Sequence, residues 1–218
     1  MTVETILPIP DIFAAKRILC IQPHYDDNDI AAAGILTQLA QNGAEIFYLT
    51  ATDDLMGVVD TTLSDKEAAD LLKSDQFAAG KIVGVKEQFW CGYPDAGEYN
   101  YFDLRRDFLK YIRMLKPDFV FAPDAWLTYE GHHDHIQTGL AAAEAVMFAG
   151  LTKIASSDPD VDAATRSMTF KASRCTSRAS QTTSQIFQPH GKIRSAPCAV
   201  TKRSSTPRVW IVSSWHWI

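Results

Sequence analysis

Four short apolar runs alternate with amphipathic helical patterns along the first 150 residues, and this alternation restricts the fold more than any other feature. The runs are 17–22, 44–52, 87–93 and 118–124, and each has the length of a strand. Strands that alternate with helices form a mostly parallel sheet, because each parallel connection needs a crossover that a helix supplies. The sequence therefore predicts an α/β fold, with a mostly parallel sheet covered by helices on both faces.

The helical patterns occupy 28–43, 64–84, 101–118 and 134–150. Ser64 and Glu67 have the spacing of a capping box, which predicts the start of the second helix. In the third helix, Leu104, Phe108, Tyr111, Ile112 and Leu115 fall on one face, and Pro117 ends the pattern. The same spacing predicts that the buried face of the fourth helix carries Ile136, Leu140, Ala143 and Met147.

Length and composition restrict the class of protein. The chain has 218 residues, 46% of them hydrophobic, which suits one domain with a sizeable core. A pI near 5.6 argues against nucleic-acid binding. No apolar run reaches the roughly 20 residues of a membrane span, and no signal peptide is evident, so we expect a cytoplasmic location. Four well-separated cysteines indicate no disulfide framework. The sequence leaves open whether the protein forms a homo-oligomer.

The composition changes abruptly near residue 163. All 26 Asp and Glu residues lie at or before Asp162, whereas the remainder holds 9 Lys and Arg residues, no acid and no leucine. Such a tail is typical of a disordered extension or of a partner-binding arm. A third interpretation is a wrong reading frame, because a one-base shift across 172–187 can encode an apolar strand and a Pro-Asn turn. We therefore predict a domain at 1–162 and a poorly ordered, basic tail at 163–218.

Two clusters of polar side chains follow the first and fourth apolar runs. Ligands of parallel sheets bind beyond the carboxyl ends of the strands, so both clusters are expected at one edge of the sheet. They contain His24, Asp26, Asp27, Asp29, His132, His133, Asp134 and His135. Catalytic zinc typically takes three His or carboxylate ligands and keeps one position open. The sequence thus predicts a metal site, and the absence of a GxGxxG motif gives a dinucleotide site little support.

The two clusters resemble motifs of the PIG-L/LmbE family of metal-dependent N-deacetylases. That family has a His-Pro-Asp-Asp-Glu type motif after its first strand and a His-x-Asp-His motif later. Here residues 24–28 read His-Tyr-Asp-Asp-Asn and residues 132–135 read His-His-Asp-His, so Tyr25 replaces the usual proline and Asn28 the usual glutamate. The resemblance covers about residues 15–150 and implies a Rossmann-like layered fold.

The resemblance also implies roles for individual residues. His24, Asp27 and His135 would bind the metal, Zn²⁺ or another divalent ion. Asp26 would be the general base, and His132 would stabilise the oxyanion with Asp134 as its charge partner. The implied enzyme is a zinc-dependent N-deacetylase in which metal-bound water attacks the amide of an acetamido sugar. Its partner would be a small N-acetylated sugar or glycoconjugate.

Two other functions fit some of these residues. Two histidines and one carboxylate also bind iron in Fe(II) oxygenases, although those sites usually stand on β-barrels, which the helical patterns oppose. A catalytically impaired metal- or sugar-binding module is the non-enzymatic alternative. Metal analysis, oxygen uptake and acetate release distinguish the three.

Overall fold

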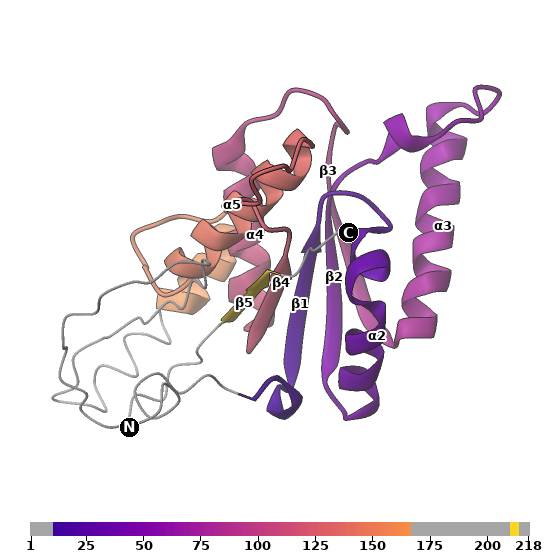
Figure 1. The fold of residues 1–218 in the computed structure, drawn as a ribbon. Coiled ribbons are helices and arrows are strands. Elements are labelled where there is room, and N and C mark those ends of the chain that lie inside the picture. Colours follow the sequence, from indigo (N-terminus) through magenta and orange to yellow (C-terminus); the bar gives the residue numbers. More distant parts are fainter. Residues whose placement is uncertain (1–10, 167–209, 214–218) are drawn as a thin grey trace, which may run out of the picture.

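A computed structural model describes residues 11–166 and 210–213 and confirms the α/β fold with a parallel sheet (Figure 1). The sheet has five strands in the order β3-β2-β1-β4-β5, and every neighbouring pair is parallel. The strands are β1 (Arg17–Gln22), β2 (Glu45–Thr52), β3 (Val85–Tyr93), β4 (Phe119–Ala122) and β5 (Trp210–Ser213).

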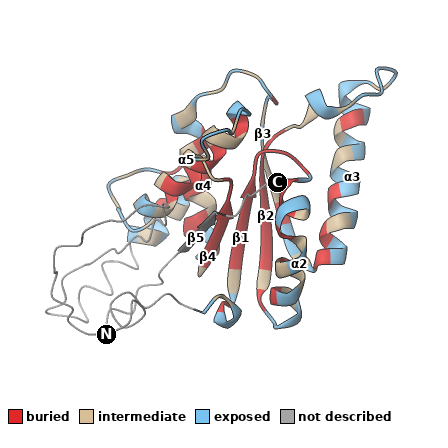
Figure 2. Cartoon of the chain, viewed as in Figure 1, coloured by how far each residue is buried: buried red, intermediate tan, exposed pale blue. Residues whose placement is uncertain are grey.

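Helices cover both faces of the sheet, as predicted. On one face lie α2 (Asp27–Gln41) and α3 (Asp65–Val83), and on the other α4 (Tyr101–Leu115) and α5 (His133–Phe148) (Figure 1). Side chains of β1 alternate between the layers, because successive strand residues point to opposite faces. Leu19 and Ile21 belong to the apolar cluster under α4 and α5, whereas Ile18 and Cys20 belong to the one under α2. The central strands are therefore buried on both sides (Figure 2).

Local signals place several helix ends as predicted. Ser64 and Glu67 form both hydrogen bonds of a capping box at the start of α3. Two short 3-10 turns, η1 (Ile12–Ala14) and η2 (Leu55–Gly57), precede β1 and follow β2. Among the residues described, no helix combines the length and the apolar character needed to cross a bilayer.

The strand order creates a topological switch point beside β1. The chain adds β2 and β3 on one side of β1 and then returns to place β4 on the other side, with Leu19 opposite Val120. At such a point the connections leave neighbouring strands in opposite directions, and a crevice opens beyond their carboxyl ends. The segments that follow β1 and β4 therefore meet at one edge of the sheet.

The predicted buried face of α5 is wrong in part. Ala143 is buried, but Met147 is 36% exposed, and Ile136 and Leu140 are only partly buried. The buried face consists of Asp134, Thr138, Gly139, Ala141, Ala142, Ala143 and Ala145. The reason is a close approach of the helix to the segment after β4, since a Cβ added to Gly139 would lie 2.5 Å from the carbonyl oxygen of Pro123. Small residues, rather than large apolar ones, permit this contact.

The predicted domain ends at a buried ion pair. The guanidinium of Arg113 donates to Asp162 at 2.6 Å and also to the carbonyl oxygens of Ile154 and Leu151, so it ties the segment after α5 to α4. Residues 159–166 are helical. Of the predicted tail, only 163–166 and β5 are described, and the rest lies outside the described residues. The domain boundary and the shifted reading frame therefore stay predictions.

The close contact at Gly139 predicts opposite effects of one substitution at two helical glycines. Gly139→Ala is expected to destabilise the fold by about 1–3 kcal/mol, because the new methyl group meets backbone atoms. Gly34→Ala in α2 meets nothing within 4 Å, so it is expected to stabilise by about 0.5–1 kcal/mol. Urea denaturation measures both, and equal shifts in the two variants would refute the close packing of α5.

Candidate metal centre

Backbone hydrogen bonds fix the loop that joins β1 to α2. The His24 N–H donates to Asp27 Oδ2 at 2.9 Å, and the Tyr25 N–H donates to Asp54 Oδ2 at 3.0 Å. The hydroxyl of Thr52 donates to the carbonyl of Pro23 at 2.8 Å. The loop is thus held by β2 and by its own carboxylate, and His24 is only 8% exposed.

The two departures from the family motif fit this loop. Tyr25 is buried, and its ring stacks at 6.4 Å on that of Trp90. Asn28 is buried in the first turn of α2, where its N–H donates to Gln22 Oε1 at 2.8 Å and its side chain donates to the carbonyl of Cys20. Neither side chain occupies the position of a predicted metal ligand.

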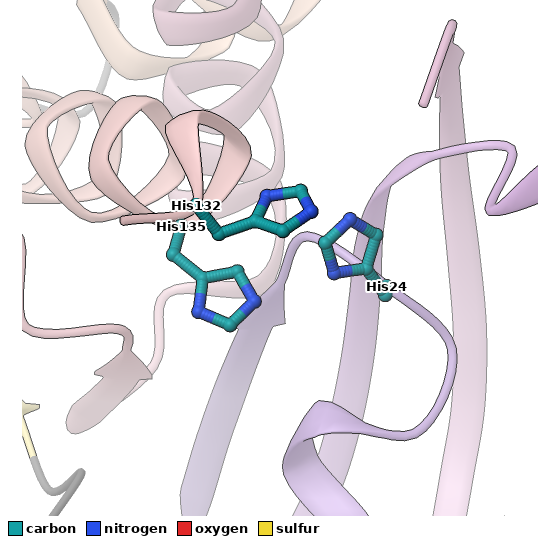
Figure 3. A group of neighbouring side chains, drawn as sticks. All are labelled: His24, His132 and His135. Atoms are coloured by element: carbon teal, nitrogen blue, oxygen red, sulfur yellow. The ribbon is translucent and has the colours of Figure 1, made fainter. Parts of the chain in front are cut away.

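Three histidines from the two clusters face one another (Figure 3). The ring centre of His24 lies 4.6 Å from that of His132 and 5.3 Å from that of His135. The Asp27 carboxylate lies between two of them, with Oδ2 3.4 Å from His24 Nδ1 and Oδ1 3.5 Å from His135 Nε2. The predicted ligands His24, Asp27 and His135 are therefore brought together.

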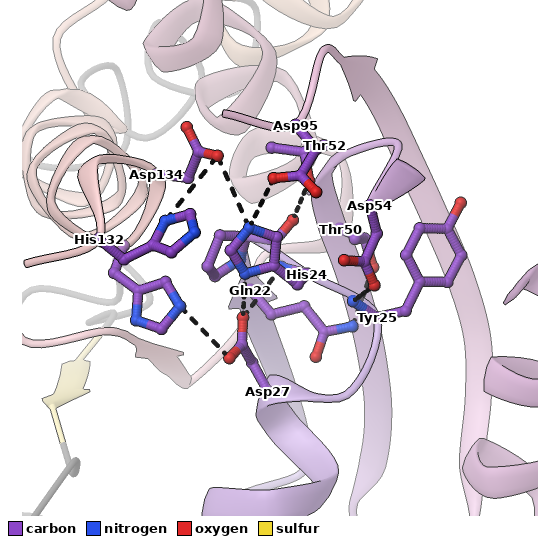
Figure 4. A network of polar contacts seen from close by, with 12 residues as sticks. Gln22, His24, Tyr25, Asp27, Thr50, Thr52, Asp54, Asp95, His132 and Asp134 are labelled. Atoms are coloured by element: carbon purple, nitrogen blue, oxygen red, sulfur yellow. Dashed lines mark hydrogen bonds and ion pairs between the residues drawn. The ribbon is translucent and has the colours of Figure 1, made fainter. Parts of the chain in front are cut away.

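The other nitrogen of His24 faces two more carboxylates (Figure 4). Nε2 lies 3.2 Å from Asp95 Oδ1 and 3.6 Å from Asp134 Oδ2. Burial of the His24 imidazole lowers its pKa, but the hydrogen bond and charge of Asp27, with the charges of Asp54 and Asp95, outweigh this effect and raise the pKa to about 9. The surroundings of His24 strongly favour positive charge.

The electrostatics of His132 differ from the expectation. Its side chain is 44% exposed, and its Nδ1 lies 4.0 Å from Asp134 Oδ2. Partial burial and the charges of His24 and His135 lower the pKa of His132, and Asp134 opposes them only in part. The Asp134 carboxylate is already engaged, because it accepts from the Ala96 N–H at 2.8 Å and from the Tyr99 hydroxyl at 2.7 Å. His132 is therefore expected to be neutral at pH 7.

The remaining residues of the two clusters are Asp26, Asp29 and His133, and the last two contact side chains outside the group of three histidines. Asp26 is the exposed N-cap residue of α2, and its side chain makes no capping hydrogen bond. Asp29 accepts from the Tyr48 hydroxyl at 2.9 Å, and the exposed His133 contacts the side chain of Gln137 at 3.0 Å. Asp26 differs from Asp29 in two respects: it is exposed to solvent, and its carboxylate makes no capping hydrogen bond.

The sequence patterns missed three carboxylates that complete the site. Asp54 and Asp95 follow the ends of β2 and β3 at the same edge of the sheet, so the topology rule that located His24 could have located them. Glu130 precedes α5, and its Oε2 lies 3.1 Å from His135 Nδ1. No motif marks Glu130, because its contact depends on how the loop before α5 folds back.

Comparison with known proteins identifies the family. The model of the PIG-L family, described as GlcNAc-PI de-N-acetylase, matches residues 19–146. The chain belongs to the PIG-L family. A diacetylchitobiose deacetylase from Thermococcus kodakarensis is 36% identical over 143 residues, which cover 66% of this chain and 54% of the relative. The chain thus spans about half the length of that relative.

Solved structures agree with this membership. An N,N'-diacetylchitobiose deacetylase from Pyrococcus horikoshii is 35% identical, with a TM-score of 0.66 over 76% of this chain and 61% of that chain. A conserved protein from Thermus thermophilus is 28% identical, with a TM-score of 0.54 over 62% of this chain and 57% of that chain.

The donor atoms of this PIG-L chain suit a divalent metal. Two groups among the described residues have ligand atoms that all lie within 4.8 Å: His24 with His132 and His135, and His24 with Asp95, His132 and Asp134. The predicted set is held by pairwise contacts to Asp27 instead. Asp27 contacts the two histidines through different oxygens, Oδ2 at 3.4 Å from His24 and Oδ1 at 3.5 Å from His135, and this set is not one of the two groups whose ligand atoms all lie within 4.8 Å.

Two variants distinguish the predicted ligand set from the group of three histidines. Asp27→Asn keeps an acceptor for the His24 N–H but loses the charge, and it should weaken Zn²⁺ binding by more than about 100-fold. His132→Ala should retain bound zinc, because the predicted set leaves His132 free for substrate. Titration against a chromophoric chelator measures both affinities. If His132→Ala lost zinc affinity and Asp27→Asn retained it, the metal would be assigned to His24, His132 and His135.

Proposed function

We propose that this PIG-L chain is a metal-dependent hydrolase that removes the acetyl group from an acetamido sugar. One observation carries the proposal. His24 Nδ1 and His135 Nε2 both face the Asp27 carboxylate beyond the ends of β1 and β4. The 36% identity with a diacetylchitobiose deacetylase supports the same chemistry.

Zn²⁺ is the proposed metal, and His24, Asp27 and His135 are its proposed ligands. When bound there, it would polarise the amide carbonyl and lower the pKa of a water molecule. The charged groups that raise the pKa of His24 are all carboxylates, and this negative surrounding supports a resident cation. Another divalent ion with affinity for imidazole and carboxylate is the alternative.

Three further residues carry the proposed reaction. Asp26 is exposed at the start of α2, so its carboxylate can accept a proton from the attacking water and pass it to the departing amine. His132 lies across from His24 and is partly exposed, so its imidazole N–H can donate to the amide oxygen as negative charge develops there. Asp134 is its proposed charge partner, with Oδ2 4.0 Å from His132 Nδ1, and a neutral His132 suffices to donate to the amide oxygen.

The proposed partner is a small N-acetylated sugar or glycoconjugate. The named substrate of two relatives is diacetylchitobiose, and the family description names a glucosamine-containing lipid headgroup. Diacetylchitobiose is therefore the first substrate to test, although this chain covers only part of those relatives. A cytoplasmic location completes the proposal.

We also propose that residues from about 163 onward derive from a shifted reading frame. The tail contains no acid and no leucine, and the family match ends at residue 146. Every proposed ligand and catalytic residue precedes that point. Resequencing the gene tests the idea, and one uninterrupted frame through codon 218 would refute it.

The alternative functions have less support. A parallel α/β sheet is not the β-barrel on which Fe(II) oxygenase sites usually stand. A metal- or sugar-binding module would bind zinc and sugar without turnover, so product formation separates it from the proposed enzyme.

Acetate release from N,N'-diacetylchitobiose by the zinc-loaded protein tests the proposed function. Asp26→Asn is expected to lower kcat by about 100-fold or more with little change in bound zinc, because the amide cannot accept the proton. Asp75→Asn, the same change at an exposed position of α3, should leave kcat unchanged. No acetate from the parent on this disaccharide or on N-acetylglucosamine would refute the proposal, and full activity of Asp26→Asn would refute the role of Asp26.

A further inference from the structure

Glu130 contacts His135 on the side opposite Asp27. Glu130 Oε2 lies 3.1 Å from His135 Nδ1, while His135 Nε2 lies 3.5 Å from Asp27 Oδ1. The two side chains of this contact, Glu130 and His135, are only 18% and 19% exposed. One ring nitrogen therefore meets a carboxylate that belongs to no predicted motif, and the other faces the proposed metal position.

The second oxygen of Glu130 holds the start of α5. Oε1 accepts from the backbone N–H of His132, the N-cap residue of the helix, at 2.8 Å. The backbone N–H of Glu130 itself donates to the carbonyl of Leu127 at 3.1 Å, which closes a turn. A single carboxylate thus connects the helix start, which carries His132, to the imidazole of His135.

An ionised carboxylate can only accept hydrogen bonds, so Glu130 selects one form of a neutral His135. The proton must lie on Nδ1, where it is donated to Oε2, and the lone pair is then left on Nε2. Metal ligation requires that lone pair. We propose that Glu130 is a positioning residue that fixes the tautomer and ring orientation of His135 and thereby raises metal affinity. The inference rests on the proposed function in that it takes His135 as a ligand.

Glutamine at this position separates the proposed role from simple packing. Its side chain has nearly the same shape as glutamate but only one oxygen. If that oxygen accepts from the His132 N–H, the NH₂ group faces His135 Nδ1 and favours the tautomer with the proton on Nε2. In Glu130→Gln, the single side-chain oxygen can accept either from the His132 N–H or from His135 Nδ1–H, but not from both. If Glu130 served only to hold the helix start, the substitution would leave metal affinity unchanged.

The first measurement is the affinity for Zn²⁺, by competition with a chromophoric chelator. Glu130→Gln should bind Zn²⁺ about 10- to 100-fold more weakly than the parent. Glu98→Gln removes the same charge from an exposed glutamate in the loop that carries Asp95, and it should change the affinity by less than about fivefold. Parent-like affinity in Glu130→Gln, or an equal loss in Glu98→Gln, would overturn the proposal.

The second measurement is the protonation of the His135 ring, by ¹⁵N NMR of the parent. We expect the proton on Nδ1 in the zinc-loaded protein, and also in the metal-free protein at a pH where the ring is neutral. A proton on Nε2 in either state would overturn the proposal even if Glu130→Gln failed to fold. A parent that binds no zinc would refute the proposed function instead, and the metal-free spectrum would still decide the role of Glu130.

Discussion

The parallel pairing of β1 with β4 is the constraint on which the site depends. His24 and His135 are more than 100 residues apart in the sequence, and they meet because the loop after β1 and the segment after β4 open at one edge of the sheet. The close packing of α5, made possible by Gly139 and its alanine neighbours, brings the helix start against that edge. Sheet order and small residues together place the donors.

The charge around these donors supports the proposed metal site. Around the buried His24 lie Asp27, Asp95 and Asp134, and crowded carboxylates repel one another unless a cation offsets them. A divalent ion beside Asp27 would supply two positive charges, and His24 would then bind it through Nδ1 and keep its proton on Nε2, which faces Asp95 and Asp134. The remaining carboxylates then act on the far nitrogens of the histidine rings, where they set which nitrogen carries the proton.

Local sequence signals predicted most of the fold, because they depend on neighbours in the chain. The capping box of Ser64 and Glu67 and the four strand-length runs are of this kind. The face of α5 was misjudged because hydrophobic spacing assumes large core residues, whereas the helix packs against Pro123 through small ones. Glu130 was missed for a related reason, since a lone acidic residue outside any motif gains its role only from tertiary contacts.

The central claim is that one divalent ion lies between the two clusters of polar side chains, bound by His24 Nδ1, Asp27 and His135 Nε2. Anomalous diffraction at the zinc edge, from crystals of the zinc-loaded protein, tests it most directly. The account predicts one strong peak within about 2.3 Å of all three side chains. A peak on the opposite side of His24, among Asp95, His132 and Asp134, or no peak at this edge of the sheet, would contradict it.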